Sequence, residues 1–513
     1  MSGISRRKFI TTSAKGAALV SIPLLFRANP LAALGGPMSE TNSLSDYYSR
    51  FGVDENSIRK VMGAGMSKGG DYCDLYFQHS ISSTIGLEDN IVNRAYSNID
   101  MGLGIRVLNG EQTGYSFTED LSPKAMGAAA KTAANIASLT QNAPPQEFKL
   151  TDTPNYYQIE TRWDEIGIDQ KIPYLQRMNE MAQSLDSRIV KTRVYFVDKS
   201  SWILQVNSDG KIMCDYQPMG VVYLACTAQD GDKRESGSKS LAGRFDIATL
   251  TEEKLQEVVS KAVDSTIKKF EAVKPQAGEM EVVLASGGSG ILLHEAIGHG
   301  MEADFNRKGV SIFADKINKP VAESFVNIVD DGTTPHHRGA INCDDECENT
   351  EKTYLVRNGI LESYLHDRIS AKYYGVKPTG NGRRESFRFA PIPRMRSTYM
   401  EAGPHTPEEI IDSVKNGLYC EDFTNGEVAI GAGDFTFYVS SGYMIEDGKL
   451  TKPVKDINII GNGPDVLKKI VMVGNDPKLD SSSWTCGKDG QSVPVSQGLP
   501  TVKVSSITVG GLS

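Results

Sequence analysis

The sequence predicts an α+β protein of two domains. The N-terminal domain is α+β with a mixed sheet and helices, and the C-terminal domain is dominated by antiparallel β-sheet in a barrel-like arrangement. The chain has 513 residues, too many for one hydrophobic core. Strand-like and helix-like segments alternate in two cycles before residue 275, whereas short strands with turn signals dominate after it. We therefore expect domains at 44–275 and 276–513, preceded by a separate segment 1–36.

The first 36 residues have the order of zones found in an export signal. Ser5-Arg6-Arg7-Lys8-Phe9-Ile10 precedes a weakly apolar run, Ala14–Phe26, and small residues follow up to Gly36. This order is typical of a twin-arginine signal, which predicts an exported, periplasmic protein. The alternative is an ordinary basic start followed by a first helix. No stretch approaches the roughly 20 apolar residues of a membrane-spanning helix, so no integral membrane segment is expected in the mature chain.

The N-terminal domain shows two cycles of strands and helices. Asn109-Gly110 is a hairpin turn, and Ser122-Pro123 has the cap residue and the first-turn proline that begin a helix. The predicted helices cover about 56–65, 123–139, 169–185 and 252–270. The predicted strands cover 72–80, 101–107, 112–117, 190–197, 201–206 and 212–225. The repetition of this plan also suggests an internal duplication.

The C-terminal domain begins after the polar stretch Lys274–Gly278. Its turn dipeptides lie among β-prone residues, which predicts hairpins; they are Asn358-Gly359, Asn425-Gly426 and Asp447-Gly448. Two helices interrupt the strands, one at about 367–374 and one that opens with a capping box at Thr406.

Charge and cysteine content exclude some classes of protein. With 55 basic and 64 acidic residues the net charge is −9, and no basic block is present. A nucleic-acid partner is therefore not expected, because phosphate neutralisation needs clustered Lys and Arg. Seven widely spaced cysteines, an odd number in a long chain, do not predict a disulfide framework.

One segment has the residue types of a metallopeptidase centre. The apolar strand 280–285 leads through the glycine-rich turn Ser286–Gly290 into a helix with His294, Glu295 and His299. In zincins, two helical histidines hold the ion and the neighbouring glutamate activates the bound water. The alternative is two unrelated histidines, one buried and hydrogen-bonded and one solvated.

The spacing of the two histidines predicts a distorted helix. Zincin histidines are four residues apart, but these are five apart, which places them about 140° apart on a regular α-helix. Both rings reach one ion only if the helix is distorted, and a π-bulge restores the common face because its repeat is i to i+5. Gly298 lowers the resistance to that distortion.

Several blocks together resemble the TldD/PmbA family of metallopeptidases. Besides the HExxxH segment, the blocks are 301–307, 330–333, 378–386, 472–476 and 486–492. The resemblance implies that His294, His299 and Cys486 are metal ligands and that Glu295 is the general base. Two imidazoles and a thiolate favour zinc, although iron also suits such a site.

The resemblance also implies what the protein acts on and assembles with. It implies cleavage of peptides or unfolded polypeptides, and a homodimer or a heterodimer with a paralogous subunit. Asn381, Arg383 and Arg384 are candidates for contacts with substrate backbone or a C-terminal carboxylate, or they simply hold a loop together. Relatives of this kind are cytoplasmic, so the predicted signal sets this chain apart.

Other functions find less support in the sequence. A non-catalytic peptide-binding or partner subunit of the same type of complex is the main alternative, but the glutamate beside His294 argues for catalysis. Gly65-Met66-Ser67-Lys68-Gly69 matches a serine-hydrolase elbow but is predicted to follow a helix rather than a strand. The segment Cys343–Cys347 is expected to be a solvated acidic turn, with a second metal site or a local disulfide as alternatives.

Overall fold

The computed structural model describes residues 43–137 and 145–511. The predicted signal, 1–36, lies outside these residues. Within the described ranges, no helix is long and apolar enough to cross a membrane. The chain from residue 40 onward forms one compact unit.

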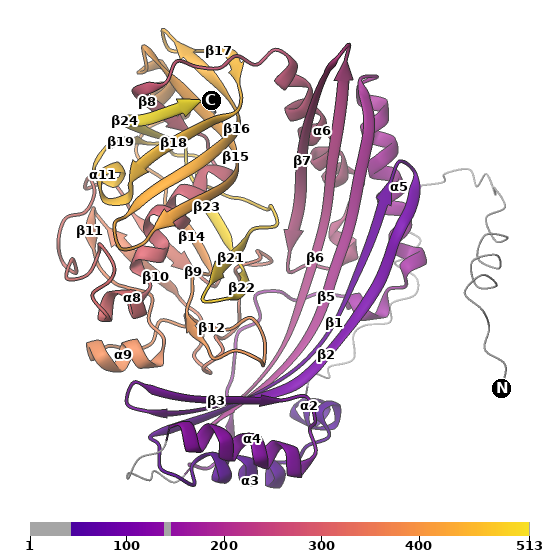
Figure 1. Cartoon of the computed structure of the whole chain (residues 1–513), viewed down its shortest axis with the longest axis vertical. Coiled ribbons are helices and arrows are strands. Elements are labelled where there is room, and N and C mark those ends of the chain that lie inside the picture. Colours follow the sequence, from indigo (N-terminus) through magenta and orange to yellow (C-terminus); the bar gives the residue numbers. More distant parts are fainter. Residues whose placement is uncertain (1–42, 138–144, 512–513) are drawn as a thin grey trace, which may run out of the picture. The chain divides into compact units, whose positions relative to one another are not determined.

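A seven-stranded sheet dominates the first part of the chain (Figure 1). Its order is β3-β2-β1-β5-β6-β4, with β7 beside β6, and only the β4–β6 pair is parallel. The strands are β1 (Tyr72–Glu88), β2 (Ile91–Asn109), β3 (Gln112–Thr118), β4 (Lys149–Leu150), β5 (Ile189–Asn207), β6 (Lys211–Asp230) and β7 (Lys233–Gly243). The sheet is therefore mixed, as predicted.

The prediction of two strands at 190–197 and 201–206 is wrong, because β5 is continuous. Polar residues at the middle of β5 gave the impression of a break. In the structure these side chains pair across the sheet with polar partners on β1: Asp198 accepts a hydrogen bond from Ser83, and Ser201 bonds Ser80 at 2.8 Å. A polar band inside a sheet is stable when its groups bond one another.

Helices cover the sheet at both ends (Figure 1). They are α2 (Leu44–Phe51), α3 (Glu55–Gly65), α4 (Pro123–Ile136), α5 (Ile168–Leu185) and α6 (Glu252–Ile267), the last continued by a 3₁₀ turn, Lys268–Phe270. Ser122 caps α4 by accepting a hydrogen bond from the Ala125 amide, as its sequence predicts. Two separate apolar clusters lie under these helices, one beneath α3 and α4 and one beneath α5 and α6.

Five strands of the second part close into a barrel, which confirms the barrel-like prediction. The ring runs β15-β8-β24-β18-β16 and returns to β15. These strands are β8 (Gly278–Leu284), β15 (Asn416–Ala429), β16 (Asp434–Glu446), β18 (Ile457–Asn462) and β24 (Val502–Gly511). All neighbours are antiparallel except β8 and β15. Two further strands extend this sheet, β17 (Lys449–Val454) and β19 (Ile470–Val473).

Smaller elements lie around the barrel. A six-stranded sheet contains β9 (Ile328–Asp331), β10 (Lys352–Arg357), β11 (Ile360–Leu361), β14 (Ser397–Met400), β20 (Lys478–Leu479) and β23 (Ser496–Leu499). Two-stranded ribbons are formed by β12 (Gly382–Arg383) with β13 (Ile392–Pro393), and by β21 (Thr485–Lys488) with β22 (Gln491–Pro494). The short helices are α8 (Ala303–Arg307), α9 (Arg368–Tyr374), α10 (Pro407–Asp412) and α11 (Gly463–Lys468). Thr406 forms the predicted capping box of α10.

The prediction of a solvated acidic turn at 343–347 is wrong. Asp344 and Glu346 are both about 1% exposed. Glu346 accepts a hydrogen bond from Arg106 of β2 at 2.7 Å, and Asp344 accepts the backbone amides of Glu346 and Glu348. Because buried carboxylates need such partners, this turn joins the first sheet to the second part of the chain.

Candidate metal centre

The histidine segment follows the first barrel strand, β8. A turn at Gly288–Gly290 leads into α7 (Ile291–Leu293), which continues as a π-helical segment, η6 (His294–Gly298), and a 3₁₀ turn, η7 (His299–Met301). The π-helix lies between the two histidines, which confirms the predicted distortion. Its wider turn brings the two imidazole rings to a centroid separation of 5.1 Å.

Gly298 has a packing role that the sequence did not reveal. Its backbone is ordinary right-handed helix, with φ −58° and ψ −50°. A β-carbon at this position would lie 2.1 Å from Sδ of Met395. The absence of a side chain therefore lets Met395 pack directly against the turn that carries the second histidine.

The thiol of Cys486 meets the two imidazoles from a distant part of the chain. Cys486 belongs to β21, and its Sγ lies 3.4 Å from Nε2 of His299. The donor atoms of His294, His299 and Cys486 all lie within 4.8 Å of one another, and all three residues are buried. In the described ranges, this is the one group of three or more His, Cys, Asp or Glu residues whose donor atoms lie close enough together to hold a metal ion.

This donor set could hold one metal ion. Zn–N bonds of about 2.0 Å and Zn–S bonds of about 2.3 Å, at tetrahedral angles, separate neighbouring donors by roughly 3.5 Å. The distance between Cys486 Sγ and His299 Nε2 matches that separation. Three protein donors leave the fourth tetrahedral position for a water molecule or a substrate, as in catalytic zinc sites.

Electrostatics favour the thiolate form that a metal requires. Burial acts to raise the pKa of Cys486, but the imidazoles of His294 and His299 outweigh it and hold the pKa of the thiol well below its usual range. Burial acts to lower the pKa of His299, yet Glu302 and Cys486 raise it well above its usual value. The thiolate is the form of cysteine that binds metals.

A carboxylate orients the second histidine from behind. Oε2 of Glu302 lies 3.0 Å from Nδ1 of His299, the ring nitrogen that does not face Cys486. Lys488 lies 3.1 Å from the same carboxylate oxygen and donates a hydrogen bond to Asp304 at 2.8 Å. Burial alone would raise the pKa of Glu302, but Lys488 and His299 hold it at about 2.

The sequence alone assigned no role to Glu302 or Asp304. The helix ends at Met301, Glu302 is extended, and Asp304 lies in the first turn of the separate helix α8, which begins at Ala303. Two spacings could have revealed the network. Glu302 is three residues after His299, and Lys488 is two residues after Cys486, so on a strand it points to the same face.

Glu295 is the accessible acid of the cluster. Its Oε2 lies 3.8 Å from Nε2 of His299, and its side chain is 20% exposed, whereas those of His299 and Glu302 are almost fully buried. Burial raises the pKa of Glu295, and the two imidazoles act to lower it. A carboxylate with a raised pKa that faces the candidate metal ligands suits a group that takes up and gives back a proton.

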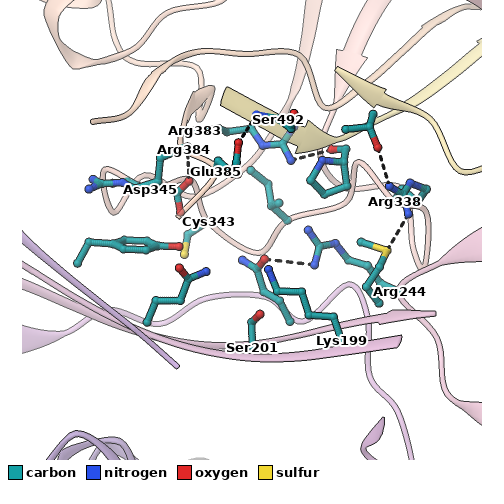
Figure 2. A pocket seen from close by; sticks show the side chains of 17 residues that line it. Lys199, Ser201, Arg244, Arg338, Cys343, Asp345, Arg383, Arg384, Glu385 and Ser492 are labelled. Carbon is teal, nitrogen blue, oxygen red and sulfur yellow. Dashed lines mark hydrogen bonds between the residues drawn. The ribbon is translucent and has the colours of Figure 1, made fainter. Parts of the chain in front are cut away.

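The candidate substrate-binding residues are buried and hydrogen-bonded within the chain. Asn381 donates to Asp330 and to the carbonyl of Arg394, and accepts from Thr379. Arg383 donates to the carbonyl of Pro494 and Arg384 to Asp74. Arg383 and Arg384 line a cavity beside the β21–β22 ribbon (Figure 2), whereas Asn381 does not line it. Substrate contact by these three residues stays a prediction.

Comparison with known proteins identifies the family. Residues 277–511 match the PmbA/TldA metallopeptidase C-terminal domain, 73–137 match domain 1 of the same family, and 161–270 match its central domain. The metalloprotease TldD homolog of Haemophilus influenzae is 38% identical over 448 residues, which cover 86% of this chain and 93% of that protein. This chain belongs to the PmbA/TldD metallopeptidase family.

A more distant relative carries a similar name, and two solved structures share the fold. The zinc metalloprotease TldD homolog of Saccharolobus solfataricus is 28% identical and covers 86% of this chain and 97% of that protein. The solved structure of a putative modulator of DNA gyrase from Thermotoga maritima has the same fold, with a TM-score of 0.73 and 21% identity, covering 89% of this chain and 100% of that one. TldE from Thermococcus kodakarensis gives a TM-score of 0.70 at 18% identity, with coverages of 89% and 100%.

The family overturns the expected location. The relatives that align over 86% of the chain are TldD metalloproteases, a cytoplasmic class of PmbA/TldD proteins. The prediction of an exported, periplasmic protein is therefore wrong. It rested on the charge and apolar zones of residues 1–36 alone, a short pattern that a basic start can produce.

Proposed function

We propose that this PmbA/TldD protein is a metal-dependent peptidase of the HExxxH type that hydrolyses peptide bonds in peptides or unfolded polypeptides. The observation that carries the proposal is the meeting of His294, His299 and Cys486 within 4.8 Å, with the carboxylate of Glu295 alongside. The names of the relatives, metalloprotease and zinc metalloprotease, support it. The family supports peptidase chemistry in general, and the residue roles are our assignment.

In this proposal His294, His299 and Cys486 hold a zinc ion. When bound, the ion would supply Lewis acidity toward the scissile carbonyl and toward an attacking water molecule. Glu295 accepts the proton of that water and delivers it to the departing amine nitrogen. Glu302 keeps the Nδ1 proton on His299, so that Nε2 presents its lone pair toward the cluster.

The same proposal covers substrate and assembly. An extended peptide can pair with a strand edge through its backbone, which gives affinity with little preference for side chains. We propose that the protein works as a homodimer or as a heterodimer with a paralogous subunit. Size-exclusion chromatography with light scattering on the purified chain, alone and with a paralogue, distinguishes these states.

The decisive experiment replaces the base and leaves the ligands in place. Glu295→Gln is expected to retain the metal and to lose peptide cleavage by at least about a hundredfold, because proton transfer by a positioned group contributes that much. Metal content is measured by elemental analysis, and cleavage by mass spectrometry of a peptide mixture. Equal cleavage by the wild type and this variant contradicts the role of Glu295.

Elemental analysis of the wild type beside Cys486→Ala and His299→Ala tests the ligand set and the identity of the metal. We expect zinc in the wild type and little metal in either variant, with iron as the other ion that this donor set accepts. A wild type that binds metal and peptides but cleaves none would favour the alternative, a non-catalytic peptide-binding or partner subunit.

A further inference from the structure

A cavity of about 210 Å³ lies between the first sheet and the loops near the metal centre (Figure 2). One wall consists of residues from β1, β5 and β6, among them Lys199 and Ser201, with Arg244 just after β7. The other wall contains Arg338, Arg383 and the β21–β22 ribbon. The cavity and the candidate metal centre are thus neighbours across a single ribbon.

The alternation of side chains along this ribbon separates the two sites. Cys486 is paired with Val493, and both are buried. Thr485 and Ser492, the neighbours of this pair, line the cavity. Because successive side chains of a strand point to opposite faces, the face of the ribbon opposite Cys486 forms part of the cavity wall.

Four cations face this cavity without a carboxylate partner. They are Lys199, Arg244, Arg338 and Arg383, and no ion pair joins any of them to an acidic group in the ranges that the structure describes. The three arginines are less than a tenth exposed. Buried charges are normally paired, because removing an ion from water costs several kcal/mol.

The contacts that these cations do make involve neutral groups. Arg244 donates to Gln217 and leaves its buried Nε without a partner. Arg338 donates to the carbonyl of Trp484 and to Thr485, and Arg383 to the carbonyl of Pro494. The Lys199 ammonium has no hydrogen bond to any other described residue.

The lowered pKa values of three of these cations reflect their burial and their mutual repulsion. Burial, together with the charge of Arg244, lowers the pKa of Arg338 to about 10. Burial and the charges of Arg244 and Arg394 lower the pKa of Arg383 to about 9. The pKa of Lys199 is lowered for the same reasons, burial first and Arg244 second. A bound anion would relieve this repulsion.

The carboxylates of the same wall are already engaged. Arg384, next to Arg383, forms an ion pair with Asp74 at 3.0 Å. Asp345 accepts the backbone amide of Arg384, and Glu385 accepts that of Ser492. Arg384 therefore has a carboxylate partner within the chain, whereas the four cations that face the cavity have none among the described residues.

We propose that this cavity binds a carboxylate of the peptide substrate, either its C-terminal carboxylate or an acidic side chain. The inference rests on the proposed peptidase function and names the preferred substrate class. A larger groove, of about 870 Å³, runs past Ser286–Gly288, the turn before the histidine segment, and shares Thr485 with the cavity. A peptide that follows this groove past Thr485 can place an acidic end among the four cations. Arginine favours carboxylates because its planar fork matches their two oxygens.

Binding to metal-loaded Glu295→Gln protein tests the inference without turnover. Calorimetry compares three forms of one peptide. The first has a free C-terminal carboxylate and the second a C-terminal amide. The third is the amide form with one internal glutamate in place of a glutamine. The acid forms are expected to bind at least about tenfold more tightly than their neutral counterparts, as charge-assisted hydrogen bonds require. This readout does not depend on hydrolysis, so it is separate from failure of the peptidase assignment.

Variants of Lys199 test whether the preference for acidic peptides arises in this cavity. Lys199→Met removes one charge and leaves no group unpaired, and is expected to reduce the acid-over-amide ratio several-fold without lowering the melting temperature. Lys199→Arg should keep the ratio. Lys131→Met, on the exposed face of α4, is the matched control and should change nothing.

Two results would overturn the proposal. One is equal affinity for the acid and the neutral peptides. The other is tight binding of inorganic phosphate combined with indifference to peptide charge, which would make the cavity a site for free anions instead.

Discussion

Glu302 and Cys486 lie on opposite sides of the His299 ring: the carboxylate is 3.0 Å from Nδ1, and the thiol is 3.4 Å from Nε2. A carboxylate behind a ligand histidine fixes its tautomer and raises its basicity. Because Glu302 is also bound by Lys488, the orientation of His299 depends on two residues outside the candidate ligand set.

Replacing Glu302 should weaken metal binding while all three ligands remain. Glu302→Gln is expected to lower metal affinity by about 10- to 100-fold, the range found for such supporting residues. Competition with a coloured chelator measures the affinity. Glu323→Gln, at an exposed position, is the control. Unchanged affinity in Glu302→Gln would mean that the histidine is oriented by packing alone.

Adding one methyl group at Gly298 should disturb the histidine turn. The new β-carbon of Gly298→Ala would meet Sδ of Met395, and overpacking of this kind costs about 1–3 kcal/mol. Urea unfolding measures the loss, and elemental analysis should show reduced metal content. Gly127→Ala, in α4 with open space around its α-carbon, should instead stabilise by up to about 1 kcal/mol. A fully stable, metal-loaded Gly298→Ala protein contradicts the packing role.

A buried ion pair near the barrel should matter far more than an exposed one. Arg396 and Asp330 form a pair at 2.8 Å that is inaccessible to solvent, and Arg396 also donates to Thr350. Arg396→Met leaves a buried carboxylate without its cation, so we expect a loss of about 3–5 kcal/mol in unfolding free energy.

The exposed pair of Arg59 and Glu55 on α3 provides the comparison. Arg59→Met should change stability by less than about 1 kcal/mol, because solvent screens this pair. Chemical denaturation of both variants gives the two values. Similar losses in both would show that burial does not determine the strength of the pair.

His366 should contribute to acid sensitivity. Burial lowers its pKa to about 4, and its Nδ1 has no partner among the described residues. The unfolded state binds a proton below its ordinary pKa of about 6.5, whereas the folded state does not do so until about pH 4. The stabilisation by neutral His366 is therefore present above pH 6.5 and is lost as the pH falls toward 4.

Substitution of His366 tests how much this residue contributes to the loss of stability in acid. His366→Phe keeps the ring packing against Tyr364 and Tyr374 and removes the titration. The loss of unfolding free energy between pH 7 and pH 4.5 should shrink by up to about 3 kcal/mol. Identical losses in the wild type and the variant would assign the acid sensitivity to other groups.

Local signals predicted the local structure well. Ser122 and Thr406 act as the caps that their sequences predict. The five-residue spacing of the histidines predicts the π-helix because a regular α-helix cannot bring both rings to one ion. The continuous strand β5 was missed because its polar centre is stabilised by β1, a partner that a single segment does not show.

The long-range parts of the site were harder to predict. Cys486 was chosen from seven cysteines only through the family resemblance, since nothing in its neighbours fixes its position in space. The cavity with Lys199, Arg244, Arg338 and Arg383 combines residues from both parts of the chain. Such a cluster depends on how the strands and loops pack, and no spacing along the chain predicts it.

The separation of the proposed metal donors along the chain has a consequence for biosynthesis. Cys486 follows His299 by 187 positions, and β24, which pairs with the strand that leads into the histidine turn, comes later still. Since a ribosome releases the chain from its N-terminus onward, an unfinished polypeptide contains both imidazoles but neither the sulfur nor a closed barrel. The proposed proteolytic activity would thus begin only after nearly the whole protein has been made.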